Sequence, residues 1–120
     1  MAETAGFSYL ASPYSDPDPA VMQQRYEAVR AEAAAMLNEG RYVFSPITHC
    51  HPMAVAHELP RGHEFWIAYD RVMLCAADEL VVLMLPGWDT SSGIAAEIEI
   101  ATEEGIEITY RAAGPERKNR

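Results

Sequence analysis

The sequence predicts an α/β protein in which a parallel sheet of four to five strands lies between two layers of helices. Segments typical of strands alternate along the chain with segments typical of helices. The segment 78–86 contains an unbroken apolar run, LVVLML, of the kind found in strands that are buried on both faces. With 120 residues, of which 49% are hydrophobic, the chain is long enough for one domain with its own core.

The first half of the chain is predicted to contain two strands and a long helix. Residues 7–12, FSYLAS, form a short apolar run that Pro13 ends, and the loop PYSDPDP follows. Over residues 20–39 the apolar side chains recur at steps of three and four, and Gly40 stands where a helix C-cap belongs. The segment 41–46, RYVFSP, is predicted to be the second strand.

Residues 46–62 carry four prolines or glycines and three histidines and show no clear period. We therefore predict a long functional loop or lid there. A helix over 63–77, the strand 78–86, a helix from about Ser92 to Glu104 and a last strand over 106–111 follow. Strands and helices in this order, joined by right-handed crossovers, are typical of a Rossmann-like (flavodoxin-like) three-layer sandwich.

Composition and charge limit the possible partners. The formal net charge of -9 disfavours nucleic-acid polymers, although a helix N-terminus can still hold a small anion such as a nucleotide phosphate. No segment approaches the roughly eighteen apolar residues of a membrane span, and the N-terminal residues lack the basic region of a leader peptide. We expect no membrane association and a cytoplasmic location. We treat residues 1–112 as a single domain and 113–120 as a basic tail that frays. Cys50 and Cys75 have no spacing typical of a disulfide framework, and we expect reduced thiols.

Glu97 is out of place on the predicted helix 92–104. Because a helix turns by roughly 100° per residue, Glu97 falls within the apolar arc of Ile94 and Ile98, while Glu99 falls on the opposite side. A carboxylate removed from water without a partner costs several kcal/mol, so a buried one is usually paired, protonated or functional. We predict that Glu97 points into the core or into a cleft. The alternative is that it lies at the rim of the core.

In parallel α/β sheets, ligands bind beyond the carboxyl ends of the strands. Three loops stand there, SPYSDPDP, SPITHCHP and PGWDTSSG, and neither the GxGxxG fingerprint nor the P-loop pattern GxxxxGK[ST] is present. TSSG stands at a helix start, where Ser91 or Ser92 can cap the helix and backbone N–H groups can hold an anion. Gly93 would let the backbone approach a ligand closely. Capping alone would also explain the two serines.

Four segments, YLASPYS, GRYVFSP, DRVMLCAAD and GIAAEIEIA, stand in this order on the predicted elements. Together they resemble the nucleoside 2-deoxyribosyltransferases and their relatives, the deoxynucleoside-monophosphate N-glycosidases. YLASPYS is similar to the YLAGP opening of that superfamily, GRYVFSP to its second strand, and GIAAEIEIA to the helix that bears its nucleophilic glutamate. The likeness spans nearly the whole chain, and SPYS, SPITH and GWDTSSG are similar to a bacterial and phage subgroup.

The resemblance implies cleavage or transfer of the N-glycosidic bond of a (deoxy)nucleoside or its 5′-monophosphate, with release of the free base. Glu97 matches the glutamate that attacks the anomeric carbon, and Asp70 matches the acid that protonates or positions the leaving base. Such chemistry needs a negative charge beneath an oxocarbenium-like centre and a proton for the departing nitrogen. Ser91 corresponds to a serine that contacts phosphate in the monophosphate hydrolases, which favours a 5′-monophosphate. The resemblance also implies a homodimer or higher homo-oligomer.

Aromatic residues near the predicted loops are candidates for contacts with the base. Tyr9 and Tyr14 flank the first loop, and Trp88 and Trp66 are further candidates for stacking. Tyr14 and Trp88 are favoured because they lie in loops rather than on apolar faces. Asp89 either orients the ribose or base or forms the turn before TSS.

Two features depart from the pattern of the superfamily. Ser12, which we also expect to contact substrate, stands where the superfamily more often has glycine. A histidine-bearing segment has no counterpart there, and it motivates an alternative in which the protein is a metal-dependent enzyme. The spacing is not diagnostic, so we predict no metal and no cofactor. The residues concerned are His49, His51, His57, His63 and Cys50.

A further alternative is a nucleotide-binding sensor that keeps the pocket and does no chemistry. Such a sensor would have a damaged acid pair, whereas Glu97 and Asp70 are both present in this chain.

Overall fold

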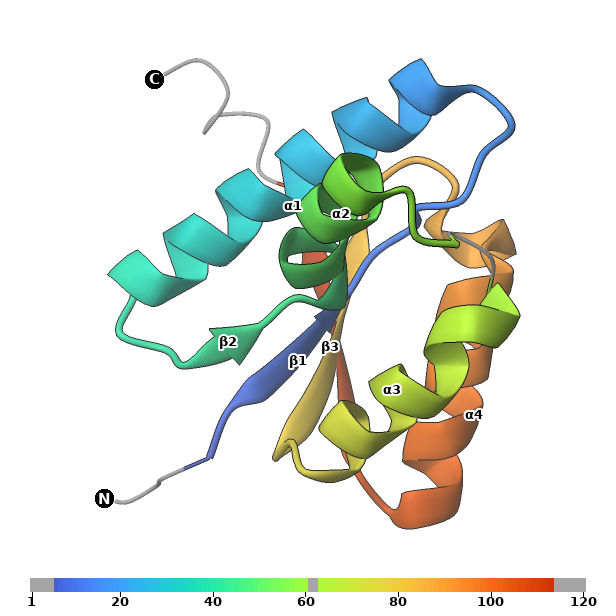
Figure 1. The fold of residues 1–120 in the computed structure, drawn as a ribbon. Helices are drawn as coiled ribbons and strands as arrows, with labels where there is room; N and C mark the ends of the chain where they lie inside the picture. The colour runs from blue at the N-terminus through green and yellow to red at the C-terminus, as the bar shows by residue number, and fades with distance from the viewer. Residues whose placement is uncertain (1–5, 61–62, 114–120) are drawn as a thin grey trace.

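A four-stranded parallel sheet forms the centre of the computed structural model, which describes residues 6–60 and 63–113 (Figure 1). The strands lie in the order β2-β1-β3-β4, and all three neighbouring pairs are parallel. This order is the flavodoxin-like one, so the predicted α/β sandwich with a parallel sheet is confirmed. The strands are β1 (Ser8–Ala11), β2 (Val43–Phe44), β3 (Glu79–Met84) and β4 (Glu107–Ala112).

Helices cover both faces of this sheet, which gives three layers (Figure 1). On one face lie α1 (Pro19–Asn38) and α2 (Pro46–His57), and on the other lie α3 (His63–Cys75) and α4 (Ser92–Glu104). A short 3₁₀ helix, η1 (Trp88–Thr90), joins β3 to α4. Within the described residues, no helix combines the length and the apolar composition needed to cross a membrane.

The core has two halves because successive side chains of a strand point to opposite faces of the sheet. One half contains residues of β1 and β3 that pack against α1, and the other contains their neighbours that pack against α3 and α4. None of these strand residues is more than 2% exposed. Leu10, Val81 and Leu83 face α1, whereas Tyr9, Leu80 and Val82 face α3 and α4.

The prediction of a long loop over 46–62 is wrong, because most of this segment is helix α2. The side chain of Ser45 accepts a hydrogen bond from the backbone of Thr48 at 3.1 Å, and Pro46 occupies the first turn, where a proline is tolerated. Pro52 removes one hydrogen bond inside the helix. Burial against α1 and the sheet offsets that loss, since one face of α2 is buried through Cys50, His51 and Ala54.

The helix that carries Glu97 begins and ends where the sequence predicts. The side chain of Ser91 accepts a hydrogen bond from the backbone N–H of Ile94 at 3.2 Å, which caps the first turn of α4. Gly105 ends the helix with φ +71°, a conformation that favours glycine. Cys50 and Cys75 are both free thiols. The predicted frayed tail lies outside the described residues except for Ala113.

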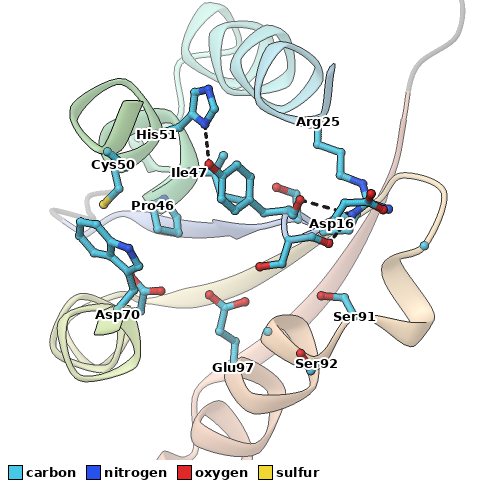
Figure 2. Close-up of a pocket in the computed structure, with 18 of the residues that line it drawn as sticks. Asp16, Arg25, Pro46, Ile47, Cys50, His51, Asp70, Ser91, Ser92 and Glu97 are labelled. Carbon is cyan, nitrogen blue, oxygen red and sulfur yellow. Dashed lines mark hydrogen bonds between the residues drawn. The ribbon is translucent and has the colours of Figure 1, made fainter. Parts of the chain in front are cut away.

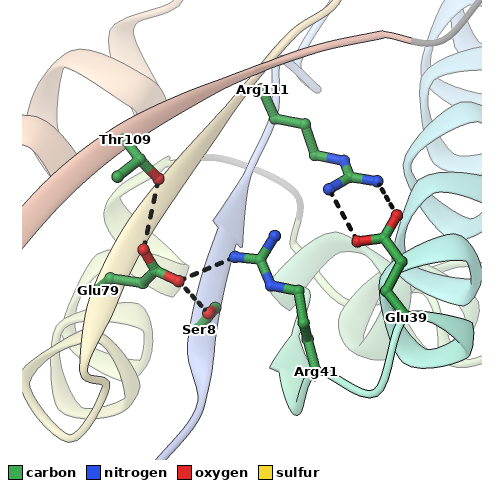
Figure 3. A network of polar contacts seen from close by, with 6 residues as sticks. All are labelled: Ser8, Glu39, Arg41, Glu79, Thr109 and Arg111. Carbon is green, nitrogen blue, oxygen red and sulfur yellow. Dashed lines mark hydrogen bonds and ion pairs between the residues drawn. The ribbon is translucent and has the colours of Figure 1, made fainter.

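Charged side chains tie the edge strand β4 to helix α1. Figure 3 shows Arg111 of β4 reaching Glu39, to which its Nη2 donates at 2.7 Å. The Nε of Arg111 donates to Glu32, a buried carboxylate of α1. In a second network, Arg41 and Ser8 donate to the same carboxylate oxygen of Glu79, at 2.9 Å and 2.6 Å.

We expect Arg111→Met to lower the free energy of unfolding by about 2 kcal/mol, because the buried Glu32 would lose this counter-ion. Arg71→Met is the control, since its contacts with Glu103 and Glu104 are longer, at 3.7 Å and 3.6 Å, and exposed. Urea unfolding of the two variants measures the difference. An equal loss in both would mean that the Arg111 bridge does not stabilise the fold.

Candidate active site

A cavity of about 380 Å³ lies at the carboxyl ends of β1 and β3. The loops that follow these two strands lead to helices on opposite faces of the sheet, and such a switch point is where α/β folds bind ligands. The volume of the cavity is in the range of small-molecule sites, roughly 300–1,000 Å³. Side chains from both loops and from all four α-helices line it.

Most of the residues that the sequence predicts for the site line this cavity, although they come from separate parts of the chain. Figure 2 shows Glu97 and Asp70 entering it from α4 and α3, and Ser91 and Ser92 standing at the first turn of α4. The predicted residues that line the cavity are Ser12, Tyr14, Asp70, Ser91, Ser92, Gly93 and Glu97.

Glu97 points inward, as predicted. Its side chain is only 7% exposed, and its carboxyl group faces the cavity (Figure 2). The hydroxyl of Tyr9, a fully buried residue of β1, donates a 2.6 Å hydrogen bond to Glu97 Oε2. Burial and the charge of Glu97 raise the pKa of Tyr9, so the phenol keeps its proton and remains the donor. Tyr9 therefore acts on the site by holding one oxygen of Glu97, which leaves the other directed at the cavity.

Asp70 is the second acid of the cavity and is held in α3. Its Oδ1 is buried and has no hydrogen-bond partner among the residues that the structure describes. Burial raises the pKa of this carboxyl to about 6. This oxygen can therefore accept a hydrogen bond from a ligand or, when it is protonated, donate its proton to one.

The two carboxyls influence each other. Burial raises the pKa of Glu97 to about 8, although the hydrogen bond from Tyr9 lowers it, and the charge of Asp70 adds to the rise. Since ionisation of either acid disfavours ionisation of the other, the pair titrates as one unit. Near neutral pH these pKa values give the pair one proton and one negative charge, with the proton more often on Glu97. The state with Glu97 ionised as nucleophile and Asp70 protonated as acid is the other arrangement of the same single proton.

The N-terminus of α4 forms another part of the cavity wall. The side chain of Ser91 accepts a hydrogen bond from the backbone N–H of Ile94, so Ser91 is the N-cap of this helix. The N–H groups of Ser92 and Gly93 lie in the first turn, where a helix offers no acceptor of its own, and both residues line the cavity. A methyl group added at Gly93 would meet no atom nearer than Ser91 Oγ, at 3.8 Å, so the space beside this glycine is open.

Three predicted residues do not line the cavity. Trp88 packs on Tyr110, with ring centroids 5.6 Å apart, and against the core beneath α4. Asp89 is exposed on η1. Tyr9 lies one layer deeper and reaches the cavity only through Glu97. The 3₁₀ helix η1 turns this loop so that Trp88 faces β4. The sequence pattern did not indicate this turn.

Trp66 of α3, a candidate for stacking in the sequence, also lines the cavity. Several other residues of the cavity wall were not predicted to contact a substrate, among them Arg25 of α1 and Asp16 of the loop before it. Five more belong to α2, where the sequence predicts a loop and gives no side-chain phase that would point them at a ligand: Pro46, Ile47, Cys50, His51 and Ala54. The remaining ones lie in the two loops of the switch point and are Pro13, Ser15, Gly87 and Thr90.

The histidines of α2 make side-chain contacts within the fold. His51 is buried, and its Nδ1 lies 2.5 Å from the Tyr14 hydroxyl while its Nε2 lies 3.0 Å from Gln23 Oε1. His49 stacks on Tyr69, with ring centroids 6.2 Å apart. The described part of the chain contains no group of three or more His, Cys, Asp or Glu side chains placed to hold a metal ion. His51 thus fixes the ring of Tyr14 at the cavity wall.

Fold and cavity together define a doubly wound α/β protein with two buried acids at its switch point. A comparison with protein families places the chain more narrowly. The family described as "Domain of unknown function (DUF1937)" matches residues 6–112, and the chain belongs to this family. A search of curated proteins gives no match.

Proposed function

We propose that this protein cleaves or transfers the N-glycosidic bond of a (deoxy)nucleoside or its 5′-monophosphate, with Glu97 as the nucleophile. The observation that carries the proposal is the buried Glu97 carboxyl, which faces a ligand-sized cavity together with a second acid. A fold gains nothing from burying two interacting acids, since each raises the cost of ionising the other. Acids whose pKa values are shifted in this way cluster at functional sites.

The proposed reaction has two steps. The Glu97 carboxylate attacks C1′ while the bond between C1′ and the base breaks, and the bonding electrons leave with the base nitrogen. Asp70 donates its proton to that nitrogen, which leaves a glycosyl ester on Glu97. Water or a second base then attacks C1′, Asp70 accepts the proton that the attacking group loses, and the Glu97 carboxylate is released.

Tyr9 is a positioning residue in this proposal. Its hydroxyl donates to one oxygen of Glu97 at 2.6 Å, so the carboxylate cannot rotate freely. The same hydrogen bond favours the ionised form that nucleophilic attack requires. The aromatic rings of Tyr14 and Trp66 line the cavity and are suited to contact a planar base.

The proposal is tested by incubating the protein with a panel of nucleosides and their 5′-monophosphates and separating the products by chromatography. We expect release of free base from at least one of them, and none when Glu97→Gln replaces the wild type. Ligand binding by the wild type without base release from any compound would favour the nucleotide sensor instead.

We expect kcat/KM to depend on pH as a bell that falls below about pH 6 and above about pH 8, as the pKa values of the acid pair indicate. At low pH both carboxyls are protonated and the nucleophile is lost. At high pH both are ionised and the proton donor is lost. The measurement is the initial rate of base release from about pH 5 to about pH 9.5, a range that extends beyond both pKa values of the pair.

Asp70→Asn supplies the control for this profile, because only the ionisation of Glu97 would remain. The basic limb should disappear, and a single rise of activity with pH should remain, with its midpoint below about pH 8 because the charge of Asp70 no longer raises the pKa of Glu97. A wild-type profile that stays flat between pH 5 and about pH 9 would be incompatible with this acid pair.

A further inference from the structure

A chain of hydrogen bonds runs from the surface of α1 to the wall of the cavity. It begins at Glu27, whose carboxylate accepts a hydrogen bond from Gln23 Nε2 at 3.0 Å, one turn earlier in the helix. Gln23 Oε1 lies 3.0 Å from His51 Nε2, and His51 Nδ1 lies 2.5 Å from the hydroxyl of Tyr14. The last two residues, His51 and Tyr14, line the cavity.

The direction of each hydrogen bond in this chain follows from the one before it. A carboxylate accepts and does not donate, so Gln23 turns its NH₂ group toward Glu27 and its carbonyl oxygen toward His51. The Nε2 of His51 therefore carries the proton, and the Nδ1 of a neutral imidazole is then an acceptor. This makes the Tyr14 hydroxyl the donor to Nδ1. Toward the cavity, Tyr14 thus offers the lone pairs of its oxygen and not its proton.

Ring packing holds the two aromatic members of the chain in place. His51 is only 5% exposed and stacks on Tyr26 of α1, with ring centroids 4.4 Å apart. The ring of Tyr14 meets that of His51 nearly at a right angle, with centroids 5.5 Å apart. Because these contacts join α1, α2 and the loop after β1, the hydroxyl of Tyr14 is oriented before any ligand binds.

The hydroxyl of Tyr14 belongs to the part of the cavity where the proposed function places the base. Figure 2 shows His51 and Asp70 on the side of the cavity away from Ser91. In the proposed reaction Asp70 protonates the leaving nitrogen, so the base lies beside it. Trp66 of α3 also lines the cavity and offers a flat apolar surface to a base.

We propose that Tyr14 is a specificity-determining residue that accepts a hydrogen bond from the exocyclic amino group of the base, so that amino-bearing bases are preferred to their oxo counterparts. His51 and Gln23 are positioning residues that set the direction of this hydrogen bond. The inference rests on the proposed function for the reaction itself. A base with a carbonyl oxygen at that position would face an acceptor with an acceptor and would lose the hydrogen bond.

The test compares nucleosides that differ by an amino or an oxo group on the base, namely adenosine with inosine and cytidine with uridine, together with their 2′-deoxy forms. We expect the wild type to have the higher kcat/KM for base release with the amino base. Since the two bases also differ as leaving groups, the decisive quantity is the change of this ratio in Tyr14→Phe, which keeps the ring and removes the oxygen. The ratio should fall by about 10- to 100-fold. An unchanged ratio, with base still released, overturns the role of Tyr14 and leaves the proposed function standing.

Gln23→Met tests the direction of the chain without a change in the cavity wall. Without the glutamine oxygen, the imidazole can carry its proton on Nδ1 and donate to Tyr14, whose own proton then turns toward the cavity. We expect the preference for the amino base to vanish or to reverse, whereas a purely structural disturbance would slow both substrates alike. Gln24→Met is the matched control, because Gln24 is an exposed glutamine of the same helix that does not line the cavity. Equal substrate ratios in the two variants overturn the directed chain.

Binding to Glu97→Gln separates this inference from the proposed function when no turnover is seen. Calorimetry should give tighter binding of the amino nucleoside than of its oxo counterpart, and the additional change Tyr14→Phe should abolish the difference. If this holds while the wild type releases no base, the base contact is supported and the glycosidic chemistry fails. Equal binding of the amino and oxo nucleosides overturns the base contact.

Discussion

Glu97→Gln should reduce base release by a factor on the order of 10⁴ while the protein stays folded. A glutamine amide has the shape of the carboxyl group and can still accept the hydrogen bond of Tyr9, so the cavity keeps its geometry. What it cannot do is form a bond to C1′. The measurement is single-turnover release of base at saturating enzyme, which isolates the chemical step from product release.

The stability of the same variant provides its control. Burial raises the pKa of Glu97 from 4.5 to about 8, so the folded protein holds a proton that the unfolded chain has already lost. The contribution of Glu97 to stability therefore falls as pH rises from about 4.5 to about 8. Glutamine does not titrate, so the Tm of Glu97→Gln should exceed the wild-type Tm by an amount that depends on pH. The difference should be larger at about pH 8.5, above that window, than at about pH 5, near its lower edge.

Two results would count against the role of Glu97. One is wild-type turnover by the glutamine variant. The other is a Tm difference that is independent of pH, since this would mean that the carboxyl titrates as an exposed one does.

Asp70→Asn should lower kcat/KM by about 10²- to 10⁴-fold with ordinary bases, the usual range for the loss of a general acid. Asparagine keeps the size of the side chain and has no proton of suitable acidity to give. Glu64→Gln is the matched control, because Glu64 is an exposed acid on the same helix and does not line the cavity.

The leaving group distinguishes proton donation from a merely structural role. With a base analogue that departs readily as an anion, Asp70→Asn should lose much less than it does with an ordinary base. A loss that is equal for both leaving groups would show that Asp70 supports the site without donating the proton. Unchanged activity with both would remove it from the mechanism.

The layered architecture could be predicted because it depends on local pattern. The apolar run of β3 is buried on both faces, as the run predicts, and its side chains alternate between the two halves of the core. Helix α4 could be bounded from its caps alone, since Ser91 and Gly105 fix its ends through hydrogen bonds and backbone conformation. Such signals involve residues a few positions apart in the chain.

The inward position of Glu97 could also be predicted, because the phase of a helix is a property of the sequence. The same helical geometry bears on Arg25, which Sequence analysis does not single out. With roughly 100° per residue, Arg25 lies beside the arc of Met22 and Val29, and the structure leaves it half-buried at the cavity. A charge at the edge of an apolar stripe was thus the signal that could have found it.

Helix α2 could not be predicted in this way. Its Pro52 breaks the local pattern, and what stabilises the helix is the burial of Cys50, His51 and Ala54 against other elements. The position of Trp88 has a similar cause, since its packing on Tyr110 joins segments far apart in the chain. Contacts of this kind depend on which distant segments come together in the fold, and the periodicity of the sequence does not encode that.

The sequence by itself determined the order of the strands and of the helices other than α2, the ends of α4 and the side of that helix on which Glu97 stands, because these follow from interactions within a turn or two of the chain. Only the tertiary structure decided which groups meet Glu97. The hydroxyl of Tyr9, 88 residues away in sequence, donates to it. Arg25 reaches the cavity because the loops after β1 and β3 come together at the switch point. Packing of the sheet brings these distant residues into contact, and their charges and hydrogen bonds depend on that contact.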